Sequence, residues 1–228
     1  MPRPSTFNFE VILHRLGPDR LASYLDDSNN DLERALDLYA WNSQIAAAFL
    51  EDLGRLEVVL RNRFDDALTE LVKSAGHSSH WFDHPALFPG RHGEHALDDI
   101  AKAKERATTN EGLPVARNKV IAELSFGFWR YLCAERYLTS LWGPALASQF
   151  PHHPTLDNAI QIRAEVDIRM ARLHFLRNRV AHHKPIHRRA LADDAKNILE
   201  LAGWMCTDTL IWMVEVSRIP AVLDSRPA

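Results

Sequence analysis

The chain has 228 residues, of which 46% are hydrophobic and 25% charged, the composition of an ordinary globular protein rather than of a disordered or fibrous one. No run of about 18 apolar residues occurs, which excludes a membrane-spanning helix, and the first residues lack the apolar region of a secretory signal. The two cysteines, Cys133 and Cys206, have no metal- or redox-type spacing, and we expect buried thiols in a reducing compartment. These features predict a cytoplasmic protein that does not bind membranes.

In the first half of the chain, the sequence pattern predicts only helices. Residues 1–27 are expected to form a short N-terminal segment with a turn or two of helix after Pro18. A helix is predicted over residues 31–41, and Asn42 and Ser43 are predicted to cap a second, longer helix. Along that helix, apolar residues recur every three or four positions from Ile45 to Leu71, which indicates one buried face.

The second half continues the helical pattern. We expect a polar surface helix over residues 91–109, a break at 110–114, and a helix that begins at Pro114 and ends at Leu124. An aromatic cluster over 125–132 is expected to pack in the core, and a helix boundary is expected at 141–144. Thr155 or Asp157 is predicted to cap the helix that leads to a basic motif. A last, densely apolar helix is predicted over 188–216. No strand pattern occurs, so the predicted class is all-α, with the main domain at 28–218 and a tail at 219–228.

The charge of the chain is unevenly distributed. Residues 160–190 contain eight basic and two acidic residues, a net charge of +6, whereas the whole chain carries −3 and the remainder therefore −9. An acidic protein with one basic segment is typical of a protein that binds a polyanion. A solvated helix face with ordinary arginines has the same composition, so charge alone leaves both interpretations open.

The basic segment ends in a motif over residues 175–187 that combines arginines, an amide, histidines and a lysine. Pro185 predicts that the helix ends near His183. Arg177 and His182 are five residues apart, about 140° of rotation on a regular helix, so they cannot share a face. Either the last turn unwinds or a second copy of the segment supplies the missing partner.

Residues 177–182 resemble the Rx4-6H signature of the HEPN superfamily, in which a polar residue often follows the arginine, as Asn178 does here. Within that superfamily the chain is similar to the Abi-like (abortive infection) proteins. Three blocks carry the resemblance in the same order: residues 56–62, residues 124–129 with 141–142, and residues 177–186. One departure is Lys184, where relatives often carry glutamate.

The resemblance implies a HEPN-like helical bundle with additional N-terminal helices, commonly dimeric, that cleaves RNA without a metal or other cofactor in phage defence or a toxin–antitoxin system. Its partners would be RNA, a second copy of the chain, and an antitoxin or defence-system protein. The implied catalytic residues are Arg177, Asn178 and His182.

The chemistry of the side chains agrees with these roles. Arginine grips two phosphate oxygens as a planar fork, and histidine transfers protons near neutral pH. His183 is a second candidate for proton transfer. Glu57 and Arg61 are candidates for supporting the site, unless they form only an ion pair on a solvated helix face. The predicted contacts to phosphate are Arg179, Lys184, His187 and Arg188.

Other interpretations of the motif remain open. An arginine and a histidine at a helix C-terminus can simply bind the last carbonyls. A metal site at His182, His183 and His187 is not expected, because Pro185 prevents helical ligand spacing and no nearby cysteine or acid completes a set. The alternative functions are a non-catalytic module that binds RNA or a partner, and a structural dimerising domain. We also expect a homodimer, formed through the last helix with Trp204 and Trp212, in which Arg177 of one chain reaches the other chain's site.

Overall fold

The structure is a computed structural model that describes residues 7–108 and 116–227, and within these ranges it contains helices and no strand. The predicted all-α class is therefore confirmed. The α-helices are α1 (Phe9–Leu16), α2 (Pro18–Asp27), α3 (Leu32–Ser74), α4 (Arg91–Ala107), α5 (Arg117–Glu123), α6 (Phe126–Tyr131), α7 (Ala159–Ala181), α8 (Leu191–Met205), α9 (Thr207–Val216) and α10 (Ile219–Asp224). Short helices η1 (Trp81–Asp83), η2 (Pro85–Leu87), η3 (Glu135–Tyr137), η4 (Leu138–Leu146) and η5 (Ala147–Gln149) connect them.

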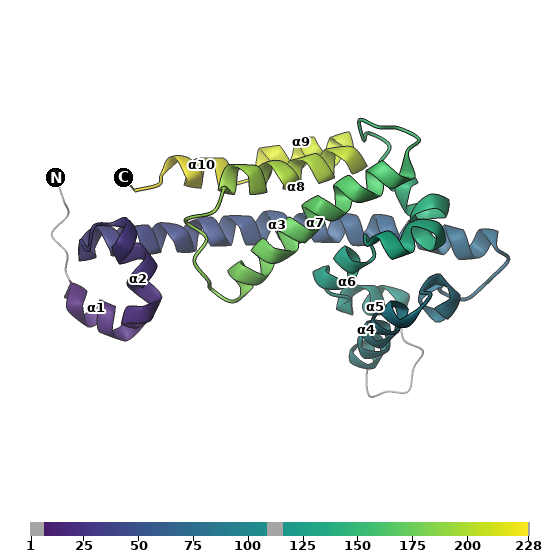
Figure 1. Ribbon diagram of the computed structural model, residues 1–228, viewed down its shortest axis with the longest axis horizontal. Coiled ribbons are helices and arrows are strands. Elements are labelled where there is room, and N and C mark those ends of the chain that lie inside the picture. The colour runs from purple at the N-terminus through teal and green to yellow at the C-terminus, as the bar shows by residue number, and fades with distance from the viewer. Residues whose placement is uncertain (1–6, 109–115, 228) are drawn as a thin grey trace.

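The fold is built along α3, which runs the length of the molecule (Figure 1). In this view α7 crosses α3, with α8 to α10 on one side of α3 and α4 to α6 on the other. The prediction of two helices over this stretch, with a cap at Asn42 and Ser43, is wrong. The side chain of Asn42 is buried inside the continuous helix and accepts hydrogen bonds from a distant loop, so no helix end needs it as a cap.

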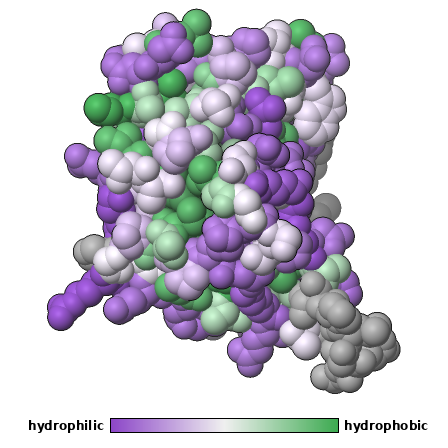
Figure 2. All heavy atoms as spheres, turned by 90° about the vertical axis from the view of Figure 1, so that its right-hand side faces the viewer, coloured by the Kyte–Doolittle hydropathy of each residue, from purple (hydrophilic) through white to green (hydrophobic). Residues whose placement is uncertain are grey.

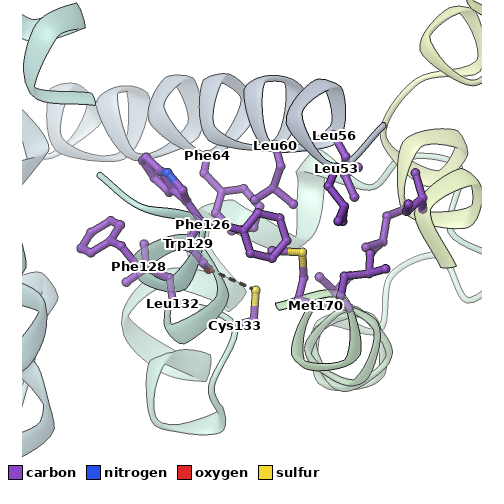
Figure 3. Close-up of a cluster of buried hydrophobic side chains, with 14 of the residues drawn as sticks. Leu53, Leu56, Leu60, Phe64, Phe126, Phe128, Trp129, Leu132, Cys133 and Met170 are labelled. Atoms are coloured by element: carbon purple, nitrogen blue, oxygen red, sulfur yellow. Dashed lines mark hydrogen bonds between the residues drawn. The ribbon is translucent and has the colours of Figure 1, made fainter. Parts of the chain in front are cut away.

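The core lies where α3, α6 and α7 meet. Leu53, Leu56, Leu60 and Phe64 of α3 are at most 1% exposed, and Figure 3 shows them above aromatic side chains of α6 and Met170 of α7. Such burial contributes roughly 1.5–3 kcal/mol for each large apolar side chain. The predicted apolar face of the long helix is confirmed. The predicted core role of the aromatic cluster is confirmed for Phe126, Phe128 and Trp129 but is wrong for Tyr131, which is 51% exposed.

Both ends of the described chain pack onto α3. In α2, Leu21 and Tyr24 are fully buried, and burial raises the pKa of Tyr24 to about 12. At the other end, residues 219–228 contain α10, where Trp41 Nε1 donates a hydrogen bond to the Val222 carbonyl at 2.7 Å. Helices on either side of the predicted 28–218 domain are thus part of the same packed unit.

Two predicted helix ends, one at residues 141–144 and one at the start of α7, differ from the structure. The boundary expected at residues 141–144 lies inside η4, a π-helix that contains Pro144. The helix runs past the expected boundary, and at its end Ala147 N–H donates a hydrogen bond to the carbonyl of Trp142, five residues earlier. Asn158, rather than Thr155 or Asp157, caps α7 by accepting a hydrogen bond from Gln161 N–H.

The predicted last helix is two helices, because the backbone of Cys206 is extended between α8 and α9. Trp204, expected to face a partner, is 8% exposed and packs against Arg169 and His153 of its own chain. The helix start expected at Pro114 lies outside the described residues.

The surface of the molecule is mostly hydrophilic at the end shown in Figure 2, and both cysteines are free thiols. At the end of the molecule that Figure 2 presents, hydrophilic side chains surround smaller groups of hydrophobic ones. Within residues 7–108 and 116–227, no helix is both long and apolar enough to cross a membrane. Cys133 is buried as expected, which raises the pKa of its thiol, whereas Cys206 is only half-buried; both are free thiols.

Candidate functional site

The basic motif lies at the C-terminal end of α7 and continues into a loop. The helix closes with two bonds: Lys184 N–H donates to the Arg179 carbonyl at 2.8 Å, and His183 N–H donates to the Val180 carbonyl at 3.0 Å. This is the Schellman pattern of a helix C-terminus, which places His183 in the left-handed region at φ +53°. The last helical residue is Ala181, so the prediction that the helix ends near His183 is confirmed.

Arg177 and His182 are not brought onto one face of α7. The helix stays regular to its end, because His182 N–H still donates to the Asn178 carbonyl at 3.1 Å. The unwinding considered for the last turn therefore does not occur, and about 140° of rotation separates the two side chains. Arg177 is half-buried beside α3, whereas His182 is exposed.

Arg177 differs from the other arginines of the basic segment because it has no partner among the described residues. Within the described ranges, its guanidinium makes no hydrogen bond or ion pair. The others are bonded: Arg163 to the Cys133 carbonyl, Arg169 to Glu200, Arg172 and Arg189 to Asp194, Arg179 to the Pro185 carbonyl, and Arg188 to Asp27. The alternative in which Arg177 binds carbonyls of the helix end is thus not what the structure shows. Its planar donors remain available to a ligand.

Two predicted residues of α3, Glu57 and Arg61, lie close to Arg177. Glu57 is half-buried, and burial raises the pKa of its carboxyl, while the positive charges of Arg177 and Arg61 partly oppose that rise. No ion pair joins Glu57 to Arg61 in the described chain, and Arg61 Nε is buried without a hydrogen-bond partner there. The site therefore combines three charged groups that are incompletely paired.

His174 belongs to this site, although the sequence-based interpretation missed it. Its Nε2 lies 3.2 Å from Asn178 Nδ2, one helical turn further along α7. Rings of α6 enclose the imidazole, with Phe126 stacked at 6.1 Å and Tyr131 edge-on at 6.0 Å between centroids. Burial and the charges of Arg130 and Arg177 lower the pKa of His174. The signal was its spacing, three residues before Arg177 and four before Asn178.

Two predicted phosphate contacts, His187 and Arg188, are turned toward α2 instead. The His187 ring is 1% exposed, stacks on Tyr24 at 4.3 Å, and lies 3.0 Å from Asp27 through Nε2. Burial lowers the pKa of His187, against the effect of Asp27. Arg188 donates to both oxygens of Asp27, which lowers the pKa of that carboxyl. These side chains hold the loop to α2, and His187 has no surface open to a phosphate.

The loop is fixed from α3 and α2 by two further hydrogen-bonding groups. Asn42 Oδ1 accepts hydrogen bonds from Ile186 N–H at 2.8 Å and His187 N–H at 3.1 Å, and all three groups are buried. Arg20 donates to the His183 carbonyl at 2.8 Å. The side chains of His183 and Lys184 are exposed, so they are accessible but not joined to the cluster around Arg177.

Arg179 combines a structural contact with partial exposure. Its guanidinium donates to the Pro185 carbonyl and lies 5.8 Å from the ring of Phe175, which is 54% exposed. The guanidinium of Arg189 lies 5.2 Å from the centroid of the same ring. The outer side of α7 therefore carries an exposed aromatic ring beside two cations.

The described side chains include no group of three histidine, cysteine, aspartate or glutamate residues that could hold a metal ion. No family model, curated protein or solved structure matches the chain. Its function is therefore inferred from the residues of the site.

Proposed function

We propose that this protein is a metal-independent endoribonuclease of HEPN type. The observation that carries the proposal is the state of Arg177, the arginine of the basic segment that is left without a partner in the described chain. A half-buried, unpaired guanidinium beside a histidine and an amide suits a phosphodiester, because it matches the geometry of two phosphate oxygens.

The convergence of the three sequence blocks supports the proposal. Glu57 and Arg61 come from the first block, Phe126 and its neighbours from the second, and Arg177 from the third. These segments are far apart in the sequence, yet they surround one half-buried position between α3, α6 and α7. The resemblance to Abi-like proteins rests on the same blocks. From that resemblance we propose a cytoplasmic role in phage defence or a toxin–antitoxin system, and an antitoxin partner.

The proposed reaction is a transesterification of RNA. A base removes the proton of a ribose 2′-hydroxyl, the 2′-oxygen bonds to phosphorus, and the bond from phosphorus to the 5′-oxygen breaks. An acid gives that oxygen a proton, which leaves a 2′,3′-cyclic phosphate and a 5′-hydroxyl. Arg177 stabilises the charge on the non-bridging oxygens, and His182 is one of the two proton-transfer groups.

We also propose that the chain forms a homodimer, and α7 carries a surface that suits it. Ile160, Ile168 and Phe175 are 64%, 67% and 54% exposed and fall within about 80° of one another around the helix. An apolar stripe on an exposed helix is suited to a partner, and a two-fold axis would place the same stripe against itself.

A second candidate function is a non-catalytic module that binds RNA. The rotation of about 140° between Arg177 and His182 favours it, because phosphate binding needs the arginine but not the histidine.

The test is cleavage of total RNA by the purified chain in excess EDTA. We expect cleavage in chelator and a loss of roughly 10²–10³-fold in Arg177→Ala, the cost of removing one donor to developing charge. Arg34→Ala is the matched control, because Arg34 is an exposed arginine paired only with Asp31. Binding without cleavage would favour the second candidate, and a strict requirement for a divalent ion would refute the proposed mechanism.

A further inference from the structure

The proposed reaction needs two groups that transfer protons, and His182 is only one. His183 was the predicted second, but its backbone forms the left-handed helix end and its side chain is exposed. The angular positions of α7 side chains show a better candidate. Around the helix, His174 lies about 60° from Arg177, Asn178 about 100° and His182 about 140°, all in the same direction.

His174, Asn178 and His182 therefore form a row at positions i, i+4 and i+8. Residues four apart on a helix are neighbours, and their side chains lean toward the helix N-terminus. His174 contacts Asn178 at 3.2 Å, and His182, the first residue after α7, follows Asn178 by one turn. The row thus places an amide between two imidazoles in sequence, and Arg177 lies on the adjacent row.

The surroundings of His174 fix its ring in place. Phe126 and Tyr131 of α6 contact the ring on two sides. Gly127 has no side chain next to Nε2, where a Cβ would lie only 3.2 Å from that nitrogen. The Asn178 amide holds Nε2 and thereby fixes the orientation of the ring. A ring fixed by an amide and two aromatic side chains is pre-organised for proton transfer.

The charges near His174 favour its neutral form. Burial and the positive charges of Arg130 and Arg177 lower its pKa below the ordinary value of 6.5. Arg130 is itself 3.7 Å from Asp167, and Tyr131 is the other titratable group against the ring. A neutral imidazole at pH 7 can accept a proton, so the environment suits a base.

We infer that His174 is the general base of the proposed ribonuclease, oriented by Asn178 and acting beside Arg177 of the same chain. This inference rests on the proposed function. With the Asn178 amide turned so that its oxygen accepts the proton on Nε2, the 2′-hydroxyl gives its proton to Nδ1 of the neutral His174 ring as the 2′-oxygen bonds to phosphorus. The His182 imidazolium gives a proton to the departing 5′-oxygen, and exchange with water restores both rings. One chain then supplies both imidazoles and the arginine, and a partner chain is not needed for proton transfer.

The experiment compares RNA cleavage by the full chain with cleavage by His174→Gln, His174→Ala and the control His77→Gln. His77 is exposed and lies beyond the end of α3, roughly 30 Å along the helix from Glu57. We expect His174→Gln to lower kcat by about 10²–10⁴-fold, as removal of a general base does, with an unchanged melting temperature. Added imidazole should restore part of the activity of His174→Ala.

The pH profile separates a base from a structural residue. In the unaltered chain, kcat/KM should fall as pH drops below 6.5, because protonated His174 cannot accept a proton, and this acidic limb should disappear in His174→Gln. Cleavage that survives His174→Gln with the same limb would refute the role of His174 alone. Lowered activity that imidazole does not rescue, with the acidic limb kept in the residual activity, would show that the residue is only structural. An inactive unaltered chain would refute the proposed function and this role together.

Discussion

Asn42 is the clearest place to test how the loop after the motif is held. Its side chain sits inside α3, 6% exposed, and accepts the backbone N–H groups of Ile186 and His187 at 2.8 and 3.1 Å. Both donors are buried, and His187 also packs on Tyr24. Substitution of Asn42 by alanine removes the acceptor and leaves two buried N–H groups without a partner.

The cost of Asn42→Ala follows from those two donors. A buried donor left unpaired costs about 1–3 kcal/mol, so two cost roughly 2–6 kcal/mol. Alanine recovers a few tenths of a kcal/mol through its higher helix propensity. For a chain of this size, each 1 kcal/mol corresponds to about 2–4 °C in melting temperature, so the expected decrease is roughly 4–20 °C.

Urea and thermal unfolding of Asn42→Ala measure this effect, with Asn62→Ala as the control. Asn62 is an exposed asparagine of the same helix, so its substitution should change the free energy of unfolding by less than about 0.5 kcal/mol. Hydrogen exchange should show loss of protection at the Ile186 and His187 amides. A decrease below about 1 kcal/mol in Asn42→Ala, or unchanged protection of those amides, would contradict the account of the loop.

Two further substitutions test the site and the dimer. A Cβ at Gly127 would lie 3.2 Å from His174 Nε2, so Gly127→Ala should displace the ring and lower cleavage roughly tenfold to a hundredfold. Gly54→Ala is the control and should keep full activity, because a Cβ at Gly54 would meet no atom within 4 Å. Equal activity of the two variants would contradict the close approach of Gly127 to His174. Ile168→Glu should convert the proposed dimer to a monomer in light scattering because it puts a charge on the α7 stripe. If Ile211→Glu on α9 does so instead, the interface lies on the terminal helices.

The helical class and the position of the motif could be predicted from the sequence because both depend on local patterns. Apolar residues every three or four positions specify a helix with one buried side, and Pro185 specifies an end. The cap at Asn42 was mispredicted because an asparagine at a helix end and one buried in a helix look alike in sequence. Only the loop at Ile186 and His187, 144 and 145 residues away, distinguishes the two.

The composition of the site could be predicted only in part. Arg177 and its neighbours in the basic segment are equivalent by residue type. They differ because carboxylates such as Asp194 and Asp27, and the carbonyls of Cys133 and Pro185, bind the others. His174 was missed because a histidine on a helix has no significance until its neighbours are known. The break at Cys206 falls three residues after Gly203, with no proline or glycine at the break itself, so the last helix appeared continuous.

The most direct measurement of the central claim uses two versions of one single-stranded RNA, in EDTA. One version is all-ribose, and the other carries 2′-deoxyribose at the nucleotide where the first is cut. The proposed reaction requires the 2′-hydroxyl, so we predict cleavage of the first to a 2′,3′-cyclic phosphate and a 5′-hydroxyl, and no cleavage of the second. Cleavage of the deoxy-substituted strand at the same position, or a 5′-phosphate on the product, would contradict the account.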